Sequence, residues 1–188
     1  MKPLIFSHAL SVAAFSLLFT ACKKNDPPIP VEEELITTLK LDVTATGFSK
    51  SFIYKVENGF GGSDSGTVVI DTIALTPNTT YNVAVQVLNE KENPVEDITA
   101  EILEENEEHL FLYNANPATG AGAITFSNGS KDDKGAPFNQ TINFTTGAAG
   151  SGSLTVYLMH LPSDKSGTTP AAAGGSTDLE AVFPVKLQ

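Results

Sequence analysis

The chain has 188 residues, of which 22 are acidic and 11 are lysine, with no arginine, and its formal net charge is −11. A chain this acidic has no basic surface that could neutralise phosphates, which argues against nucleic-acid binding. The single cysteine excludes an intramolecular disulfide, so the fold must depend on apolar burial or on a bound metal.

The first 21 residues have the layout of a cleaved signal peptide. Lys2 supplies a positive charge, residues 4–19 form an apolar segment, and two small residues precede Cys22. The apolar segment is too short for a transmembrane helix. We therefore predict cleavage over residues 1–21 and a lipid-modified Cys22. The alternative is an ordinary signal peptide with an incidental cysteine.

The residues before Cys22 resemble the bacterial lipobox, in which the cysteine receives diacylglycerol. Lipoproteins of that type carry two or three acyl chains, palmitate among them, and this number is sufficient for stable anchoring. The resemblance implies a lipid-anchored protein of the cell envelope and outer membrane, whether periplasmic or surface-exposed. The proline-rich and acidic residues 22–34 are predicted to form a tether, and residues 35–188 one domain.

The mature domain shows a period-2 alternation of apolar and polar residues, which predicts β-strands. The pattern covers residues 36–46, 52–56, 67–75, 80–88, 109–113, 123–127, 141–145, 153–161 and 179–187. This spacing is typical of an all-β fold, an antiparallel β-sandwich of about nine strands. The turn at Thr76–Asn78 predicts a hairpin of the third and fourth strands. Pro184 places the last strand at an edge or a bulge.

Residues 93–108 break the alternation and predict one short amphipathic helix across an end of the sandwich. Asn93 and Pro94 are suited to the start of the helix. An apolar stripe and an opposite acidic face follow at helical spacing. The stripe comprises Ile98, Ile102 and Leu103, and the acidic face comprises Asp97, Glu101, Glu104, Glu105 and Glu108.

The mature chain contains two histidines, His109 and His160. Imidazole is the commonest protein ligand of transition metals and haem, so the pair is a candidate site for haem or zinc, with Glu105 or Glu108 as a further metal ligand. In the alternative interpretation, His109 is stabilised by a helix C-terminus and His160 is only hydrogen-bonded. A shared site requires the two imidazoles to converge.

Two acidic, glycine-rich loops, residues 57–64 and 130–135, are candidate calcium sites, the second through Asp132 and Asp133. Both are equally consistent with hairpin turns. Asp71-Thr72-Ile73 resembles the O-glycosylation motif of exported proteins in Bacteroidota, which makes Thr72 a candidate modification site.

Catalytic motifs give little support for an enzyme. The chain has no Gly-x-Ser-x-Gly elbow, no His-Glu-x-x-His and no phosphate-binding loop. The remaining enzymatic alternative is a carboxylate pair of the kind that hydrolyses glycosides, and no spacing in the sequence indicates one. We therefore expect no catalytic residue.

Two features resemble small outer-membrane lipoproteins of Bacteroidota, namely residues 22–26 and the run of residues 33–188 with its segments 71–73, 78–83 and 96–99. Some relatives carry the name "type 1 periplasmic binding fold superfamily protein", whose α/β fold conflicts with the strand pattern here. The resemblance implies a binding or accessory protein anchored in the membrane, with an outer-membrane protein as partner. The alternatives are haem or metal capture by His109 and His160, and a structural or adhesive surface role.

Overall fold

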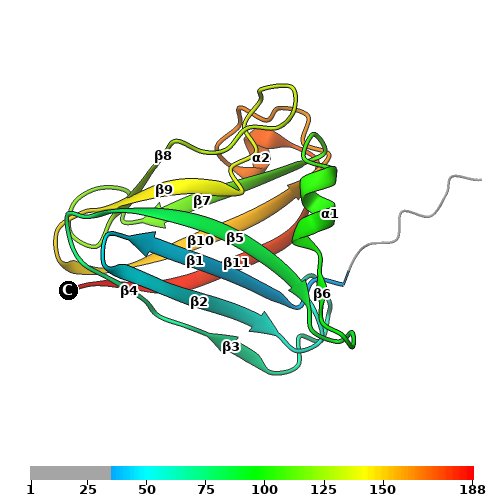
Figure 1. Ribbon diagram of the computed structural model, residues 1–188, viewed down its shortest axis with the longest axis horizontal. Coiled ribbons are helices and arrows are strands. Elements are labelled where there is room, and N and C mark those ends of the chain that lie inside the picture. Colours follow the sequence, from blue (N-terminus) through cyan, green and yellow to red (C-terminus); the bar gives the residue numbers. More distant parts are fainter. Residues whose placement is uncertain (1–34) are drawn as a thin grey trace, which may run out of the picture. The chain divides into compact units, whose positions relative to one another are not determined.

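The computed structural model describes residues 35–188, which form an all-β sandwich of two sheets (Figure 1). The predicted fold class is therefore confirmed. The predicted signal peptide, Cys22 and the tether lie outside the described residues. Within residues 35–188, no helix has the length and apolar character needed to cross a membrane.

The larger sheet has seven strands. Its order is β3 (Val68–Ile70), β2 (Phe48–Val56), β1 (Thr38–Ala45), β5 (Thr80–Asn89), β9 (Thr141–Thr146) and β8 (Ile124–Ser127), with β6 (Glu96–Asp97) also paired to β5. All of its pairs are antiparallel. Alternate residues of β1 and β5 are fully buried, which is the pattern that the sequence predicted for these segments.

The smaller sheet has the order β4 (Ile73–Leu75), β11 (Ser176–Leu187), β10 (Gly150–His160) and β7 (His109–Asn116). Its pairs are antiparallel except for β4 with β11. Strand β10 lies between β11 and β7, and it buries apolar residues on both of its faces. Its inner face joins the main core, and Met159 on its outer face packs with Ala173 of the short helix α2 (Pro170–Ala173).

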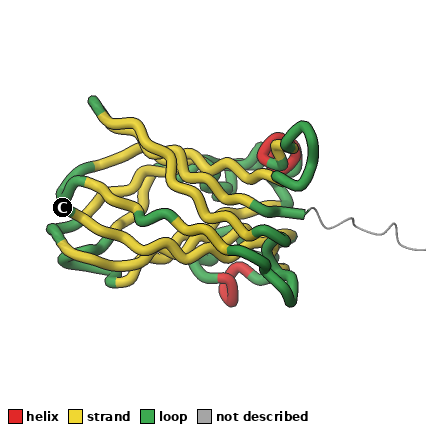
Figure 2. The backbone as a smooth tube through the Cα atoms, turned by 90° about the horizontal axis from the view of Figure 1, so that it is seen from below, coloured by secondary structure: helices red, strands yellow, loops and turns green. Residues whose placement is uncertain are grey.

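One hydrophobic core unites the two sheets. Its members come from alternate positions of the long strands. The ring of Tyr54 in β2 packs edge-to-face against that of Phe183 in β11, with the ring centroids 5.7 Å apart. Helix α1 (Thr99–Glu104) adds Ile102, and Ile98 lies just before it. Figure 2 shows both helices toward the end away from the C-terminus, the end at which β7 begins, β10 ends and β11 begins.

The third predicted strand is two strands in different sheets. The chain breaks at Asp71–Thr72, where the Asp71 carboxylate accepts a hydrogen bond from the Ile53 N–H at 2.9 Å and holds the crossing against β2. The predicted hairpin was wrong, because β4 runs parallel to β11 whereas β5 pairs with β1 and β9. The turn after β4 is present but carries the chain from one sheet to the other. The described residues therefore hold eleven strands and two helices rather than about nine and one.

Helix α1 begins at Thr99, not at Asn93 and Pro94 as predicted. Residues 96–97 add a short strand to β5 instead. The buried Thr99 hydroxyl accepts a hydrogen bond from the Val87 N–H at 2.8 Å and donates one to the Val87 carbonyl at 3.2 Å. These bonds replace the strand partner that the Val87 backbone in β5 lacks where β6 ends. Leu103 is exposed, so the apolar side of the helix is narrower than predicted.

Candidate metal site

His109 and His160 are direct partners in the ladder between β7 and β10. Each shares a strand face with core residues two positions away, Phe111 and Leu158, so both lie on the inner side of the small sheet. Their rings stack with centroids 4.9 Å apart and planes inclined by 9°. The two imidazoles therefore converge, which is the condition that a shared site requires.

A third side chain, Asp178, joins the pair because of a β-bulge. Leu158 pairs with Leu179 but Met159 pairs with Thr177, so the register shifts by one residue and β11 accommodates Asp178 as an extra residue at this point. Such a bulge redirects a side chain that regular alternation would turn to the other face. One nitrogen of each histidine and one carboxylate oxygen of Asp178 lie within 4.8 Å of one another. We call these three residues the His/His/Asp site.

The His/His/Asp site draws one residue from each of three neighbouring strands. His109 is the first residue of β7, His160 is the last of β10, and Asp178 is the third of β11. His109 is buried, whereas His160 and Asp178 are half-buried. The site therefore lies at the end of the sandwich, where it is reachable from solvent through the latter two residues.

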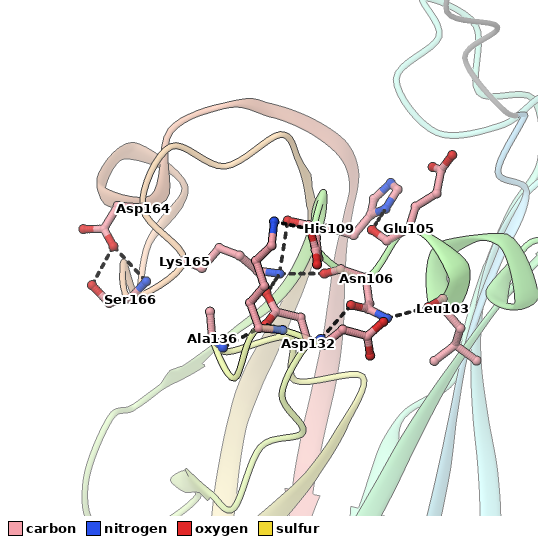
Figure 3. Close-up of polar contacts among 12 residues, drawn as sticks. Leu103, Glu105, Asn106, His109, Asp132, Ala136, Asp164, Lys165 and Ser166 are labelled. Carbon is pink, nitrogen blue, oxygen red and sulfur yellow. Dashed lines mark hydrogen bonds and ion pairs between the residues drawn. The ribbon is translucent and has the colours of Figure 1, made fainter.

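The backbone fixes the orientation of the His109 ring. Its Nδ1 lies 3.1 Å from the carbonyl oxygen of Glu105, the residue that follows α1 (Figure 3). A carbonyl oxygen can only accept, so Nδ1 carries the proton and Nε2 keeps its lone pair. An imidazole oriented in this way by a backbone carbonyl is the usual arrangement of a metal ligand.

Burial lowers the pKa of His109, because it disfavours the charged imidazolium. The hydrogen bond to Glu105 and the carboxylates of Asp178 and Glu105 raise the pKa, whereas the neighbouring His160 lowers it further. The net effect is a pKa below the ordinary value of 6.5. His109 is therefore neutral at pH 7. Only the neutral ring has a lone pair to donate to a metal.

Two imidazole nitrogens and one carboxylate oxygen form a ligand set suited to Zn²⁺, Cu²⁺ or Fe²⁺. Coordination bonds of about 2.0–2.2 Å place tetrahedral ligand atoms about 3.4 Å apart, so small side-chain rotations would close the present spacing around one ion. Stacked rings on adjacent strands approach such an ion from the same side. They do not suit the two axial positions of a haem iron, which lie on opposite faces of the porphyrin.

The carboxylates predicted as further metal ligands are not members of the His/His/Asp site. Within residues 35–188, the His/His/Asp site is the one group of three or more suitable side chains within ligand distance. Glu105 and Glu108 are exposed, and Glu105 contributes its backbone carbonyl rather than its side chain. Asp133 is exposed as well, and its N–H donates to the Asn106 side chain at 3.0 Å.

The Asp132 carboxylate, a candidate calcium ligand in the sequence, forms hydrogen bonds within the protein. It accepts hydrogen bonds from the N–H groups of Lys134 at 3.0 Å and Ala136 at 2.8 Å, and from Nζ of Lys165 at 2.7 Å. Burial raises the pKa of this carboxyl, but these bonds outweigh burial and hold the pKa below its ordinary value. Its oxygens are therefore already used by the protein.

The other predicted calcium loop, residues 57–64, also uses its carboxylates to shape turns. Glu57 accepts a hydrogen bond from the Thr67 N–H at 2.9 Å, and Asp64 accepts one from the Gly66 N–H at 3.1 Å. Thr72 lies exposed in the two-residue link between β3 and β4. An exposed link is accessible to a modifying enzyme, and glycosylation of Thr72 stays a prediction.

Asp178 is the residue of the site that the sequence pattern did not predict. Residues Leu179 to Leu187 alternate regularly, and extending that alternation backwards places Asp178 on the outer face with Glu180. One signal in the sequence was the glycine pair Gly174–Gly175 just before the strand, which marks an irregular entry.

No protein-family model matches the chain, and no curated protein is significantly similar to it.

Proposed function

We propose that this protein binds a divalent transition-metal ion through His109, His160 and Asp178, as a lipid-anchored protein of the cell envelope. The convergence of these three side chains, each from a different strand, is the observation that supports the proposal. The oriented, neutral ring of His109 adds to it.

The ligand chemistry favours Zn²⁺ or Cu²⁺ over Ca²⁺ and Mg²⁺. Imidazole nitrogen suits the former ions, whereas calcium and magnesium prefer sites made only of oxygen. Three protein ligands leave at least one coordination position for water or an external ligand. Such a site suits capture and exchange of the ion better than permanent structural binding, in which four protein ligands close the site.

The lipid anchor predicted at Cys22 gives this binding a place in the cell. An anchored domain retains its ion at the membrane surface, where an outer-membrane partner would receive or supply it. The open coordination position is the feature that such a transfer would use. Metal capture therefore becomes the specific form of the binding or accessory role that the sequence implied.

The test is a titration of the purified mature lipoprotein in detergent with ZnCl₂, followed by isothermal calorimetry, and with CoCl₂, followed by visible absorption. We expect one ion per chain and cobalt d–d bands that Zn²⁺ abolishes. Asp178→Asn should weaken zinc binding by about tenfold or more, because loss of a direct ligand should cost no less than loss of a residue that only orients a ligand. The matched control is Glu180→Gln, which makes the same change two residues along the same strand, on an exposed side chain.

Equal losses in Asp178→Asn and Glu180→Gln would show that general charge, not coordination, governs binding. A wild-type protein that binds neither ion would contradict the proposal and leave the structural or adhesive role. Haemin provides the other comparison. A Soret shift that is lost in both His109→Ala and His160→Ala, without zinc binding, would favour haem capture instead.

A further inference from the structure

We propose that Lys165 is a positioning residue for the His/His/Asp site, which it organises from a distance through a buried ion pair with Asp132. This inference rests on the proposed metal-binding function. It concerns the loop of residues 161–175, which directly joins two of the three ligands. The loop leaves β10 after His160 and enters β11 two residues before Asp178.

Lys165 bonds to two other segments of the chain. Its Nζ donates to the Asp132 carboxylate at 2.7 Å, to the Asn106 carbonyl at 2.6 Å and to the Glu107 carbonyl at 3.4 Å (Figure 3). The three donors of the ammonium group are thus all engaged. The side chains of Lys165 and Asp132 are only 11% and 3% exposed, so little water screens the pair.

The segment that Lys165 binds also orients the metal ligands. Residues 105–108 connect α1 to β7, and we call them the 105–108 connection. The Glu105 carbonyl at its start accepts the hydrogen bond from His109 Nδ1. The Glu108 carbonyl at its end accepts one from the Leu161 N–H at 2.7 Å, next to His160. Lys165 binds the carbonyls of Asn106 and Glu107, which lie between these two. It therefore fixes a connection that holds His109 directly and holds His160 through the adjacent Leu161.

The backbone beside His160 is held in a strained conformation. Leu161 has a φ of +50°, a left-handed conformation that a bulky residue seldom adopts, and its side chain is exposed. Such strain persists only where surrounding contacts enforce it, and it is concentrated at functional sites. The bond from Leu161 to Glu108 and the clamp at Lys165, four residues further on, are contacts that enforce it here.

Further hydrogen bonds hold the far side of the ion pair in place. Asp132 is held by two backbone N–H groups of its own loop. Asn106 bridges the same loop and helix α1, because its side chain accepts from the Asp133 N–H at 3.0 Å and donates to the Leu103 carbonyl at 2.8 Å. Lys165 therefore bonds to a preorganised cradle of carboxylate and carbonyl oxygens.

The test compares Lys165→Met with Lys134→Met in the mature lipoprotein. Lys134 lies in the loop that contains Asp132 and forms an exposed pair with Glu107, so it controls for charge and location. Zinc affinity is measured by competition with a chromophoric chelator. The ring tautomers of the metal-free protein are measured by long-range ¹H–¹⁵N NMR, a readout that needs no metal. Lys165→Arg, which retains charge and donors, serves as the rescue.

In the wild type we expect a fixed Nδ1-protonated tautomer for His109. Lys165→Met should give a mixed tautomer and a zinc affinity about 10–100-fold lower, the usual effect of losing a residue that orients ligands. Lys134→Met should leave the His109 tautomer and the zinc affinity unchanged, and Lys165→Arg should bring both close to their wild-type values. If Lys165→Met does not fold, Asp132→Asn removes the charge but keeps an acceptor for the loop, and the same two readouts apply.

The outcomes separate the two proposals. A folded Lys165→Met with wild-type zinc affinity and a wild-type His109 tautomer overturns the positioning role and leaves metal binding intact. A wild type that binds no zinc overturns the proposed function, and the His109 tautomer then decides the positioning role alone. A drop in thermal stability without a change in either readout shows that Lys165 is merely structural and overturns the positioning role.

Discussion

Gly175 passes so close to His160 that a Cβ atom on Gly175 would lie closer than 3.0 Å to the His160 carbonyl oxygen, a separation that real Cβ atoms essentially never have. Gly175 also has a φ of +77°, which side chains disfavour. The glycine therefore lets the 161–175 loop return tightly against the strand it left. This close return brings the start of β11, and with it Asp178, beside His160.

Gly175→Ala should destabilise the protein by about 1–3 kcal/mol, since the backbone must shift and the left-handed conformation becomes strained, and it should also weaken zinc binding. Gly122→Ala is the matched control. Gly122 has a φ of +82° and the same clash with the Ser151 carbonyl, near the opposite end of β10. Urea unfolding should show similar losses in both variants, whereas a zinc titration should be impaired only in Gly175→Ala. Equal zinc affinity in Gly175→Ala and Gly122→Ala would show that Gly175 has no specific effect on the His/His/Asp site.

The lowered pKa of His109 predicts a pH dependence in the metal-free protein. The folded state binds the His109 proton more weakly than the unfolded state, whose histidine titrates near 6.5. Stability from this group is therefore fully present above pH 6.5 and is lost as the pH falls toward the folded pKa. The slope for one proton is about 1.4 kcal/mol per pH unit.

Urea midpoints between pH 8 and 5 check this dependence. His109→Asn retains an N–H donor for the Glu105 carbonyl but does not titrate, so its profile should be flatter than that of the wild type. The neighbours that face His109, namely His160, Asp178 and the Glu105 carboxylate, remain in both proteins, so the difference between the profiles reports His109 and its coupling to them. Identical profiles, or a wild type that gains stability in acid, would contradict the assignment.

Regular alternation predicted most of this fold, because a strand with one buried face has only two choices for each side chain. The same parity rule places His109 with Phe111 and His160 with Leu158, so both histidines were predictable as inward-facing residues once their strands were known. Their mutual distance was not predictable, because it depends on the register between β7 and β10.

The errors have specific physical causes. Asp71–Thr72 interrupts an apolar run that alternation alone reads as one strand, and the break is enforced by a distant contact with Ile53 of β2. Pro94 is suited to a helix start, but Thr99 bonds to Val87 and sets the start there. Asp178 was missed because a bulge reverses the parity that predicted its neighbours. Each error depends on a contact between segments far apart in the sequence.

The two lysine pairs near the site should differ in their effect on stability. Lys165→Met leaves the Asp132 carboxylate buried without its cation, which costs about 3–5 kcal/mol when one partner of a buried pair is removed. Lys134→Met breaks an exposed pair with Glu107, and such pairs contribute about 0–1 kcal/mol. Chemical denaturation of the metal-free variants measures both values. A small loss in Lys165→Met would mean that water already screens the buried pair.

Deletion of Asp178 would test the bulge itself. Without this residue, Thr177 and Leu179 become consecutive and keep their present partners Met159 and Leu158, so the ladder between β10 and β11 becomes regular. We expect a free energy of unfolding within about 1 kcal/mol of the wild type, because bulges interrupt a ladder rather than strengthen it. Zinc binding should be lost as completely as in Asp178→Ala, which keeps the bulge but lacks the carboxylate.

A deletion variant that still binds zinc with wild-type affinity would show that Asp178 is not a ligand. A variant that fails to fold would show instead that the loop of residues 161–175 needs the extra residue to close. The expected result, a stable protein that no longer binds zinc, would mean that the bulge serves the site and not the sheet.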